Sequence, residues 1–267
     1  MRRGDATPPP GGVEAHGHAG VPGVVRLAFE GVGQFLVSPD TVVVDPQGRA
    51  PGSELGNLIT GPALATLLHL RGHLVLHASC VGFGQGTDEC AVAFMGDSAW
   101  GKSTAGAACV RAGHRLLADD TTALDPGSPE PLVIPAYPRI KLFPDSLEAL
   151  GLDPGAYEPI HPGSPKRVLR AHEGFTWEPA SLRRIYLLDG GGDEPAGVEP
   201  IEEAEAFVEL VRHTFAVDLL EMTGTRARHF EQAAEVAARV PVRRLRVDGE
   251  LANVTRIPAM VAEDLAQ

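Results

Sequence analysis

The sequence has few of the features that mark secreted or membrane proteins. Its three cysteines, Cys80, Cys90 and Cys109, are an odd number and lie too far apart for a C-x-x-C metal or redox motif, so we expect reduced, buried thiols in a cytoplasmic protein. No apolar run approaches the roughly 18 to 20 residues that cross a bilayer. The basic start, Met1 to Arg3, is not followed by the apolar core of a signal peptide. We therefore expect no membrane association.

Basic residues are also scarce. The chain holds 23 lysines and arginines against 35 acidic residues, which gives a net charge of −12. A general binder of nucleic acid needs a basic face that releases counterions, so this balance argues against a nucleic-acid partner. Only three of the basic residues are lysines: Lys102, Lys141 and Lys166.

The chain divides by composition into three parts. Residues 1–22 are rich in proline and glycine and hold almost no large apolar side chains, which predicts a disordered tail. Residues 23–72 form a β-rich N-terminal portion, with expected strands at Val24–Phe29, Gln34–Val37 and Thr41–Val44 and a helix at Gly61–Leu70. The remaining residues, 73–267, form one larger unit, which agrees with a length suited to one or two domains.

The larger unit opens with a predicted β-hairpin. Two strand-like runs, 73–83 and 90–95, flank the polar loop Gly84–Glu89. If the loop centre lies between residues 86 and 87, the residue numbers of any two paired residues add up to 173. This register places His77 opposite Gly96.

A phosphate-binding loop follows the hairpin. The motif G-x-x-x-x-G-K-[ST] is matched between an expected strand and an expected helix, the context that it requires. Glycines let successive N–H groups point inward, and the helix N-terminus adds its positive end. Lys102 is expected to reach the β- and γ-phosphates of ATP, and the Ser103 hydroxyl to bind Mg²⁺. The predicted nucleotide-binding residues here are Gly96, Asp97, Ser98, Ala99, Trp100, Gly101, Lys102, Ser103 and Thr104.

Two adjacent carboxylates are expected beside this loop. A helix over 102–112 would cover about 16 Å, and the strand from Arg115 to Asp119 would return about 16 Å. The chain then comes back level with the phosphates at Asp119 and Asp120. One carboxylate could serve the metal and the other accept a proton from an attacking hydroxyl, while His77 could hydrogen-bond one of them.

These segments resemble a known family. The loop from Gly96 to Ser103, the stretch Arg111–Asp120 and the preceding Leu76–Ser79 are similar to the catalytic domain of the bacterial HPr kinase/phosphorylase. The resemblance implies an α/β P-loop kinase of the phosphoenolpyruvate-carboxykinase type, a mixed sheet flanked by helices, with residues 73–267 as the catalytic domain. It also implies that Asp120 accepts the proton of a substrate serine, that His77 is its partner, and that Asp119 lies near the metal.

The chain departs from that family at two places. A Glu-Ile-Arg signature is replaced by Tyr137-Pro138-Arg139, which keeps the arginine but not the Mg²⁺-binding carboxylate, and the family's own N-terminal domain is missing. The shorter layout is more similar to HPr-kinase-related enzymes such as lasso peptide kinases. That resemblance implies roles for Arg139, Lys166 and Arg167 in stabilising phosphate charge. Trp100 could stack on a nucleotide or simply pack.

The residues and the resemblance together predict an ATP- and Mg²⁺-dependent serine kinase. The expected acceptor is a serine in a peptide or small protein, including the C-terminal serine of a lasso peptide precursor. Two alternatives remain open: a kinase acting on a small-molecule hydroxyl, and a nucleotide-binding regulatory module without transfer activity. The kinase family that the chain resembles forms hexamers, so a homo-oligomer is compatible with this prediction.

Overall fold

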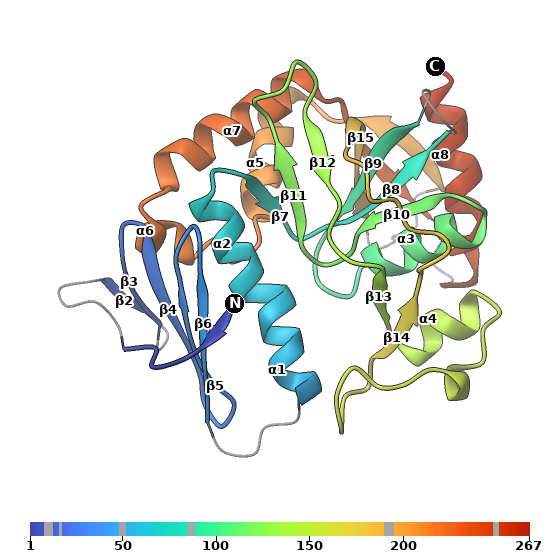
Figure 1. Ribbon diagram of the computed structural model, residues 1–267. Coiled ribbons are helices and arrows are strands. Elements are labelled where there is room, and N and C mark those ends of the chain that lie inside the picture. The colour runs from blue at the N-terminus through green and yellow to red at the C-terminus, as the bar shows by residue number, and fades with distance from the viewer. Residues whose placement is uncertain (8–12, 16–17, 48–51, 85–88, 190–194, 248–250) are drawn as a thin grey trace.

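Two β-sheets of different construction dominate the structure (Figure 1), a computed structural model that describes residues 1–7, 13–15, 18–47, 52–84, 89–189, 195–247 and 251–267. The N-terminal sheet has six strands in the order β1-β6-β5-β4-β3-β2. Strands β2 to β6 pair antiparallel along the chain, whereas β1 lies parallel to β6. The strands are β1 (Arg2–Arg3), β2 (Val13–Ala15), β3 (His18–Val21), β4 (Val24–Phe29), β5 (Gly33–Val37) and β6 (Val42–Pro46).

The prediction of a disordered tail over residues 1–22 is wrong for the part of that stretch that the structure describes. Strand β1 pairs with β6, β3 pairs with β4, and Ala6 is buried. Residues 8–12 and 16–17, which hold the proline and glycine run, lie outside the described residues. The strands are stabilised by pairing with later segments, so the lack of large side chains in residues 1–22 did not reveal them.

A helical segment packs on the N-terminal sheet and starts earlier than predicted. It comprises α1 (Gly52–Leu58), a π-helical stretch over Ile59–Ala63 that contains Pro62, and α2 (Leu64–Leu70). Proline has no N–H for the ordinary helical hydrogen bond, which accounts for the irregular stretch around it. Leu58 and Leu67 pack against buried Leu27 and Phe35, and Met222 from α6 (Leu219–Thr223) joins the same core.

The second sheet has nine strands and mixes parallel with antiparallel pairing. Strand β15 (Ala180–Asp189) is its centre: it lies parallel to β9 and β17 along most of its length and antiparallel to β12 at its start. The other strands are β7 (Leu74–Leu76), β8 (Ser79–Phe83), β9 (Cys90–Met95), β10 (Arg115–Ala118), β11 (Thr122–Asp125), β12 (Leu132–Ile134), β16 (Gly197–Pro200) and β17 (Val242–Arg246). A separate pair, β13 (Arg139–Leu142) and β14 (Arg167–Arg170), lies beside it.

Helices cover both faces of the nine-stranded sheet, which confirms the predicted mixed sheet flanked by helices. On one face, α5 (Glu203–Arg212) and α7 (Arg226–Arg239) bury Leu210 and Val236 against strand residues such as Leu76. On the other, α3 (Lys102–Arg111), α4 (Pro144–Ala149) and α8 (Ile257–Leu265) share a core with Val92 and Tyr186. Short 3₁₀ turns lie at Pro154–Ala156 and Leu251–Arg256.

The predicted hairpin has the expected register but ends earlier than expected. Strands β8 and β9 pair Ser79 with Phe94 and Cys80 with Ala93, and both pairs sum to 173. His77 lies outside this ladder, because the chain leaves the pairing with β11 at Leu76 and begins the pairing with β9 at Ser79. Most of the predicted loop, residues 85–88, lies outside the described residues.

No helix in the described ranges is both long and apolar enough to cross a membrane. The three cysteines are unpaired thiols: Cys80 and Cys109 are buried and Cys90 is half-buried. Burial raises the pKa of both buried thiols well above the usual range. They therefore serve as small apolar core residues, as predicted.

Candidate functional site

The phosphate-binding loop joins the end of β9 to the start of α3. Gly101, which precedes the helix, has φ of 87° and Ala99 has φ of 69°, so the backbone turns through left-handed conformations on both sides of Trp100. Gly96 is needed for a close approach, since a Cβ there would lie 3.1 Å from the carbonyl oxygen of Leu188. The loop is therefore curled tightly at the N-terminus of a helix, the arrangement that binds phosphate.

Lys102 lies in the first turn of that helix with its side chain folded back over the loop. Its Nζ donates hydrogen bonds to the carbonyl oxygens of Gly96 and Asp97, at 2.9 and 3.0 Å. Lys102 is buried. Burial lowers the pKa of the amine, while the nearby charge of Asp120 acts in the opposite direction. The one lysine of the motif is thus placed inside the loop that it is expected to serve.

Asp120 is held between two side chains from separate parts of the chain. Its Oδ1 lies 3.0 Å from Nε2 of His77, and its Oδ2 accepts a hydrogen bond of 2.8 Å from Nζ of Lys141. The backbone of Asp120 has φ of 74°, which is uncommon for a residue with a side chain and is found where the surroundings fix the conformation. The carboxylate is consequently fixed in both position and direction.

The surroundings keep Asp120 ionised. Burial alone would raise the pKa of this carboxyl, but the hydrogen bond from His77 and the positive charge of Lys141 outweigh it and hold the pKa well below its usual range. A negative charge at this position is therefore present at neutral pH.

Asp119 points into the protein and has the opposite character. Burial, together with the neighbouring charge of Asp120, raises the pKa of Asp119 to about 6, although the N–H of Lys141 and the hydroxyls of Ser103 and Ser79 act to lower it. Its Oδ2 accepts a hydrogen bond from the N–H of Lys141 at 3.1 Å. Within the described part of the chain, the buried Oδ1 has no hydrogen-bond partner of ordinary length.

A carboxylate oxygen in this position suits a metal ion. Mg²⁺ is usually bound by one or two carboxylates together with substrate phosphates, and not by a cage of protein ligands alone. Asp119 Oδ1 and the nearby Ser103 hydroxyl match that pattern, and the described residues contain no group of three or more acidic, histidine or cysteine side chains that could form a cage. The residues present therefore fit an Mg²⁺ ion bound together with a nucleotide.

The loop, the two carboxylates and their partners surround one cavity of about 390 Å³. Such a volume lies in the range of small-molecule sites. Of the residues predicted from the sequence, the following line it: His77, Ser98, Ala99, Gly101, Lys102, Ser103, Thr104, Asp119, Asp120 and Lys166. The predicted return of the chain to the level of the loop at Asp119 and Asp120 is confirmed.

Other predicted residues do not line this cavity. Gly96 and Asp97 contribute carbonyl oxygens to Lys102 from behind the loop, and Trp100 is 39% exposed. The expectation that Arg139 faces the transferred phosphate is not met, because its guanidinium lies over the Tyr137 ring, 5.2 Å from the centroid.

Arg167 likewise lies outside the cavity lining. It donates a hydrogen bond to the carbonyl oxygen of Ser164, whereas its neighbour Lys166 reaches the cavity with its amine 4.9 Å from the centroid of the Phe143 ring. Of the predicted Lys-Arg pair, only the lysine is therefore positioned to act on a ligand in this site.

Sequence reasoning missed Lys141 as a site residue. It had the signal of being one of only three lysines, but a strand residue of this kind is usually a solvated charge. In the structure its side chain is 15% exposed and its amine is bound to Asp120. Lys141 thus provides a positive charge close to the Asp120 carboxylate, a role for which the sequence predicted no residue.

Arg212 at the end of α5 is a second residue that was missed. Its Nη2 contacts both carboxylate oxygens of Asp97, at 2.6 and 2.8 Å. Because Asp97 is the second residue of the loop, this ion pair connects the loop to a helix that lies more than 100 residues later. No local pattern in the sequence reports such a contact.

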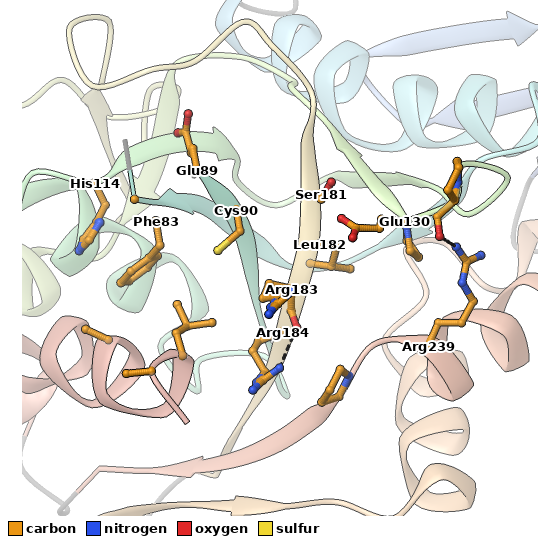
Figure 2. Close-up of a pocket in the computed structure, with 17 residues that line it drawn as sticks. Phe83, Glu89, Cys90, His114, Glu130, Ser181, Leu182, Arg183, Arg184 and Arg239 are labelled. Carbon is orange, nitrogen blue, oxygen red and sulfur yellow. Dashed lines mark hydrogen bonds between the residues drawn. The ribbon is translucent and has the colours of Figure 1, made fainter. Parts of the chain in front are cut away.

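A larger cavity of about 890 Å³ lies elsewhere, lined by residues from β8, β9 and β15 and by the end of α8 (Figure 2). It contains three arginines, but two of them are bound to neighbouring protein groups. Arg184 pairs with Asp264, and Arg239 pairs with Glu235 and donates to carbonyl oxygens at Pro126 and Ser128.

No protein-family model matches the chain, and no curated protein matches it. A solved structure of the Hpr(Ser) kinase/phosphatase from Coxiella burnetii is similar at a TM-score of 0.39 and 12% identity, covering 71% of this chain and 89% of that chain. At this level of likeness, evidence for a function has to come from the site residues themselves.

Proposed function

We propose that this protein is a kinase that transfers the γ-phosphate of ATP, in the presence of Mg²⁺, to a serine hydroxyl. One observation carries the proposal: Asp120 is fixed between His77 and Lys141 in the same cavity as Lys102 and Ser103 of the phosphate-binding loop. A nucleotide-binding loop alone would need no oriented carboxylate facing the phosphates. A kinase needs one, to receive the proton of the attacking hydroxyl.

The loop residues bind and orient the nucleotide. The N–H groups at the start of α3 and the amine of Lys102 attract the phosphates, and Lys102 exchanges its contacts with loop carbonyls for contacts with phosphate oxygens. Lys166, at the cavity edge, adds a further positive charge. Together these groups offset the negative charge that moves to the leaving ADP.

Asp119 and Ser103 would hold Mg²⁺. The ion supplies charge neutralisation between the β- and γ-phosphates when it is bound. Asp119 must be ionised for this role, and its pKa of about 6 leaves it mostly ionised at pH 7. Its buried Oδ1 faces no competing protein donor of ordinary hydrogen-bond length among the described residues.

Asp120 receives the proton. As the serine Oγ forms its bond to the γ-phosphorus, the bond from that phosphorus to the bridging oxygen of ADP breaks and the hydroxyl proton passes to the Asp120 carboxylate. Each carboxylate oxygen keeps a lone pair beside its contact with His77 or Lys141. A weak base is sufficient, because a loose transition state places little demand on early proton removal.

A serine within a peptide or small protein is the acceptor class that we propose, with the C-terminal serine of a lasso peptide precursor as a specific candidate. Support comes from the sequence similarity of the segments around His77, the loop and the aspartate pair to serine-directed kinases. A cytoplasmic location and a homo-oligomeric state belong to the same proposal.

The test is phosphate transfer to short synthetic peptides that carry serine at the C-terminus or internally, with matched alanine peptides as controls. Mass spectrometry should detect one added phosphate on serine peptides with the wild-type protein and MgATP. The Asp120→Asn variant should bind ATP with unchanged affinity and lose transfer. ATP binding without transfer to any peptide or free hydroxyl compound, and equal ATP turnover in both proteins, would instead support a regulatory nucleotide-binding module.

A further inference from the structure

A groove that shares the lining residue Lys141 with the catalytic cavity lies beside the N-terminal sheet. It has a volume of about 530 Å³ and is bounded by three segments that are distant in sequence. Phe29 and Glu30 contribute from the end of β4, Glu54 and Leu58 from α1, and Ile160 from the segment before β14. The N-terminal sheet and its helix therefore form one side of a groove whose other side belongs to the larger unit.

Lys141 connects the groove to the catalytic cavity. It lines both hollows, and its amine is bound to Asp120. A chain lying in the groove would therefore arrive next to the carboxylate that we assign as proton acceptor. The two hollows share Lys141 as a lining residue, and no residue of the loop Gly96–Ser103 lines the groove.

The two sides of the groove are connected by polar contacts. Asn57 Nδ2 on α1 donates to the carbonyl oxygen of Ile160 at 3.3 Å, and Thr121 Oγ1, directly after Asp120, donates to the carbonyl oxygen of Thr60 at 3.4 Å. These contacts join the N-terminal helical segment to the chain on both sides of the active site. The groove is thus bounded by segments that contact one another directly.

The lining combines apolar surface, the two imidazoles of His18 and His161, and two carboxylates. Phe29, Leu58 and Ile160 are partly exposed, and Glu30 and Glu54 form no ion pair with any residue in the described ranges. The only lysine of the lining is already neutralised by Asp120. Two carboxylates without partners repel a nucleotide's phosphates and attract an amine or a guanidinium.

We infer that this groove binds the acceptor peptide, with an apolar residue against Phe29 and Leu58 and a lysine or arginine near Glu30 and Glu54. The inference rests on the proposed function, because it places the acceptor serine at Asp120. It gives the N-terminal sheet a role in substrate recognition, and it selects basic, apolar sequences next to the serine over acidic ones.

The experiment measures binding and transfer separately. Fluorescently labelled peptides that share one serine and one leucine, and differ only in a neighbouring arginine, glutamine or glutamate, are titrated with the protein. The wild type should bind the arginine peptide most tightly and the glutamate peptide least tightly. Glu54→Lys, and more strongly Glu30→Lys combined with Glu54→Lys, should reverse the order, with a change of about fivefold for each charge.

The control is Glu231→Lys, a charge reversal on α7 at an exposed residue that lines neither hollow. It should leave the order of the three peptides unchanged. ATP affinity should be equal in all variants, because none of Glu30, Glu54 and Glu231 lines the cavity of the phosphate-binding loop.

The outcomes separate the two proposals. If the charge-reversal variants reverse the order of peptide affinities but no peptide is phosphorylated, the groove proposal would be upheld and the kinase proposal overturned. If transfer depends on Asp120 but Glu54→Lys does not change the order of affinities of the three peptides, the kinase proposal would be upheld and the groove proposal overturned. Failure of all peptides to bind, or an equal loss of affinity for all three, would also overturn the groove.

Discussion

Two cavities of this protein, the one of about 890 Å³ and the one that contains Asp120, hold charged side chains in different arrangements. In the larger one, whose lining Figure 2 shows, Arg184 forms an ion pair with Asp264 and Arg239 forms one with Glu235. In the smaller one, the imidazole of His77 and the amine of Lys141 converge on Asp120 beside the phosphate-binding loop. Charged side chains that are paired within the protein stabilise the fold. Charged and polar side chains that gather on one carboxylate in a cavity are available to act on a ligand. The predictions below test this contrast.

Replacing Lys141 by methionine should slow phosphate transfer strongly, and we expect a larger effect from it than from the changes at Asp264, Asp119 and Arg212 described next. The variant removes a charge-assisted hydrogen bond to Asp120, which is a loss of about 1.5–3 kcal/mol and corresponds to roughly 10- to 100-fold slower phosphate transfer. The pKa of Asp120 should rise, so the acidic limb of the pH–rate profile should move to higher pH. Arg183→Met, in the larger cavity, is the matched control. It should leave the transfer rate and the acidic limb of the pH–rate profile unchanged.

Asp264→Asn should affect stability without affecting chemistry. Asp264 is buried and accepts a hydrogen bond of 2.9 Å from the Tyr186 hydroxyl, beside Arg184 and Arg243. Removing its charge leaves two arginines without their counter-ion, so the free energy of unfolding should fall by about 1–3 kcal/mol. Denaturant titration measures this change. If the folded variant also transferred phosphate more slowly than the wild type, the result would contradict our assignment of the larger cavity to stability and the smaller one to chemistry.

Mg²⁺ binding to the nucleotide complex should depend on pH through Asp119. The pKa of this carboxyl is raised to about 6, so it is neutral below that pH and charged above it. A proton therefore competes with Mg²⁺ only on the acidic side. Affinity should be constant above about pH 7 and should fall about tenfold by pH 5.

Mg²⁺ titration of the Asp119→Asn variant at the same pH values serves as the reference. It measures the pH dependence that comes from the phosphates of ATP alone. The variant should bind Mg²⁺ more weakly and show only the pH dependence of ATP. Identical curves for both proteins would place the metal away from Asp119.

Arg212→Gln should have the smallest effect. Its ion pair with Asp97 is half exposed on the arginine side, and exposed pairs contribute about 0–1 kcal/mol. We expect an increase in the KM for ATP of less than about fivefold, with little change in kcat. Isothermal titration with ATP checks this, and added salt should weaken binding less in the variant than in the wild type.

Much of the site could be predicted from local sequence. The loop motif, the helix behind it and the strand that ends at Asp119 all lie within one short stretch, so their lengths alone bring the carboxylates back to the loop. The hairpin register followed from the loop centre in the same way. These features depend on near neighbours, which a single sequence displays.

The features that were missed depend on distant contacts. Strand β1 exists because it pairs with β6, about 40 residues away along the chain. Arg139 and Lys141 lie two apart on one strand, so alternation gives them the same side. In the structure the Arg139 guanidinium lies over the Tyr137 ring, and of the two residues Lys141 lines the cavity. The groove beside Lys141 requires three separate segments, and no local pattern reports such an assembly.

The most direct test is single-turnover phosphate transfer from MgATP to a serine peptide, measured side by side for the wild type, Asp120→Asn and Arg183→Gln. Loss of the proton acceptor should slow transfer by about 100- to 10,000-fold at unchanged ATP affinity. Arg183→Gln, in the larger cavity, should transfer at the wild-type rate. Equal rates for the wild type and Asp120→Asn would contradict the assignment of Asp120 as the group that receives the proton.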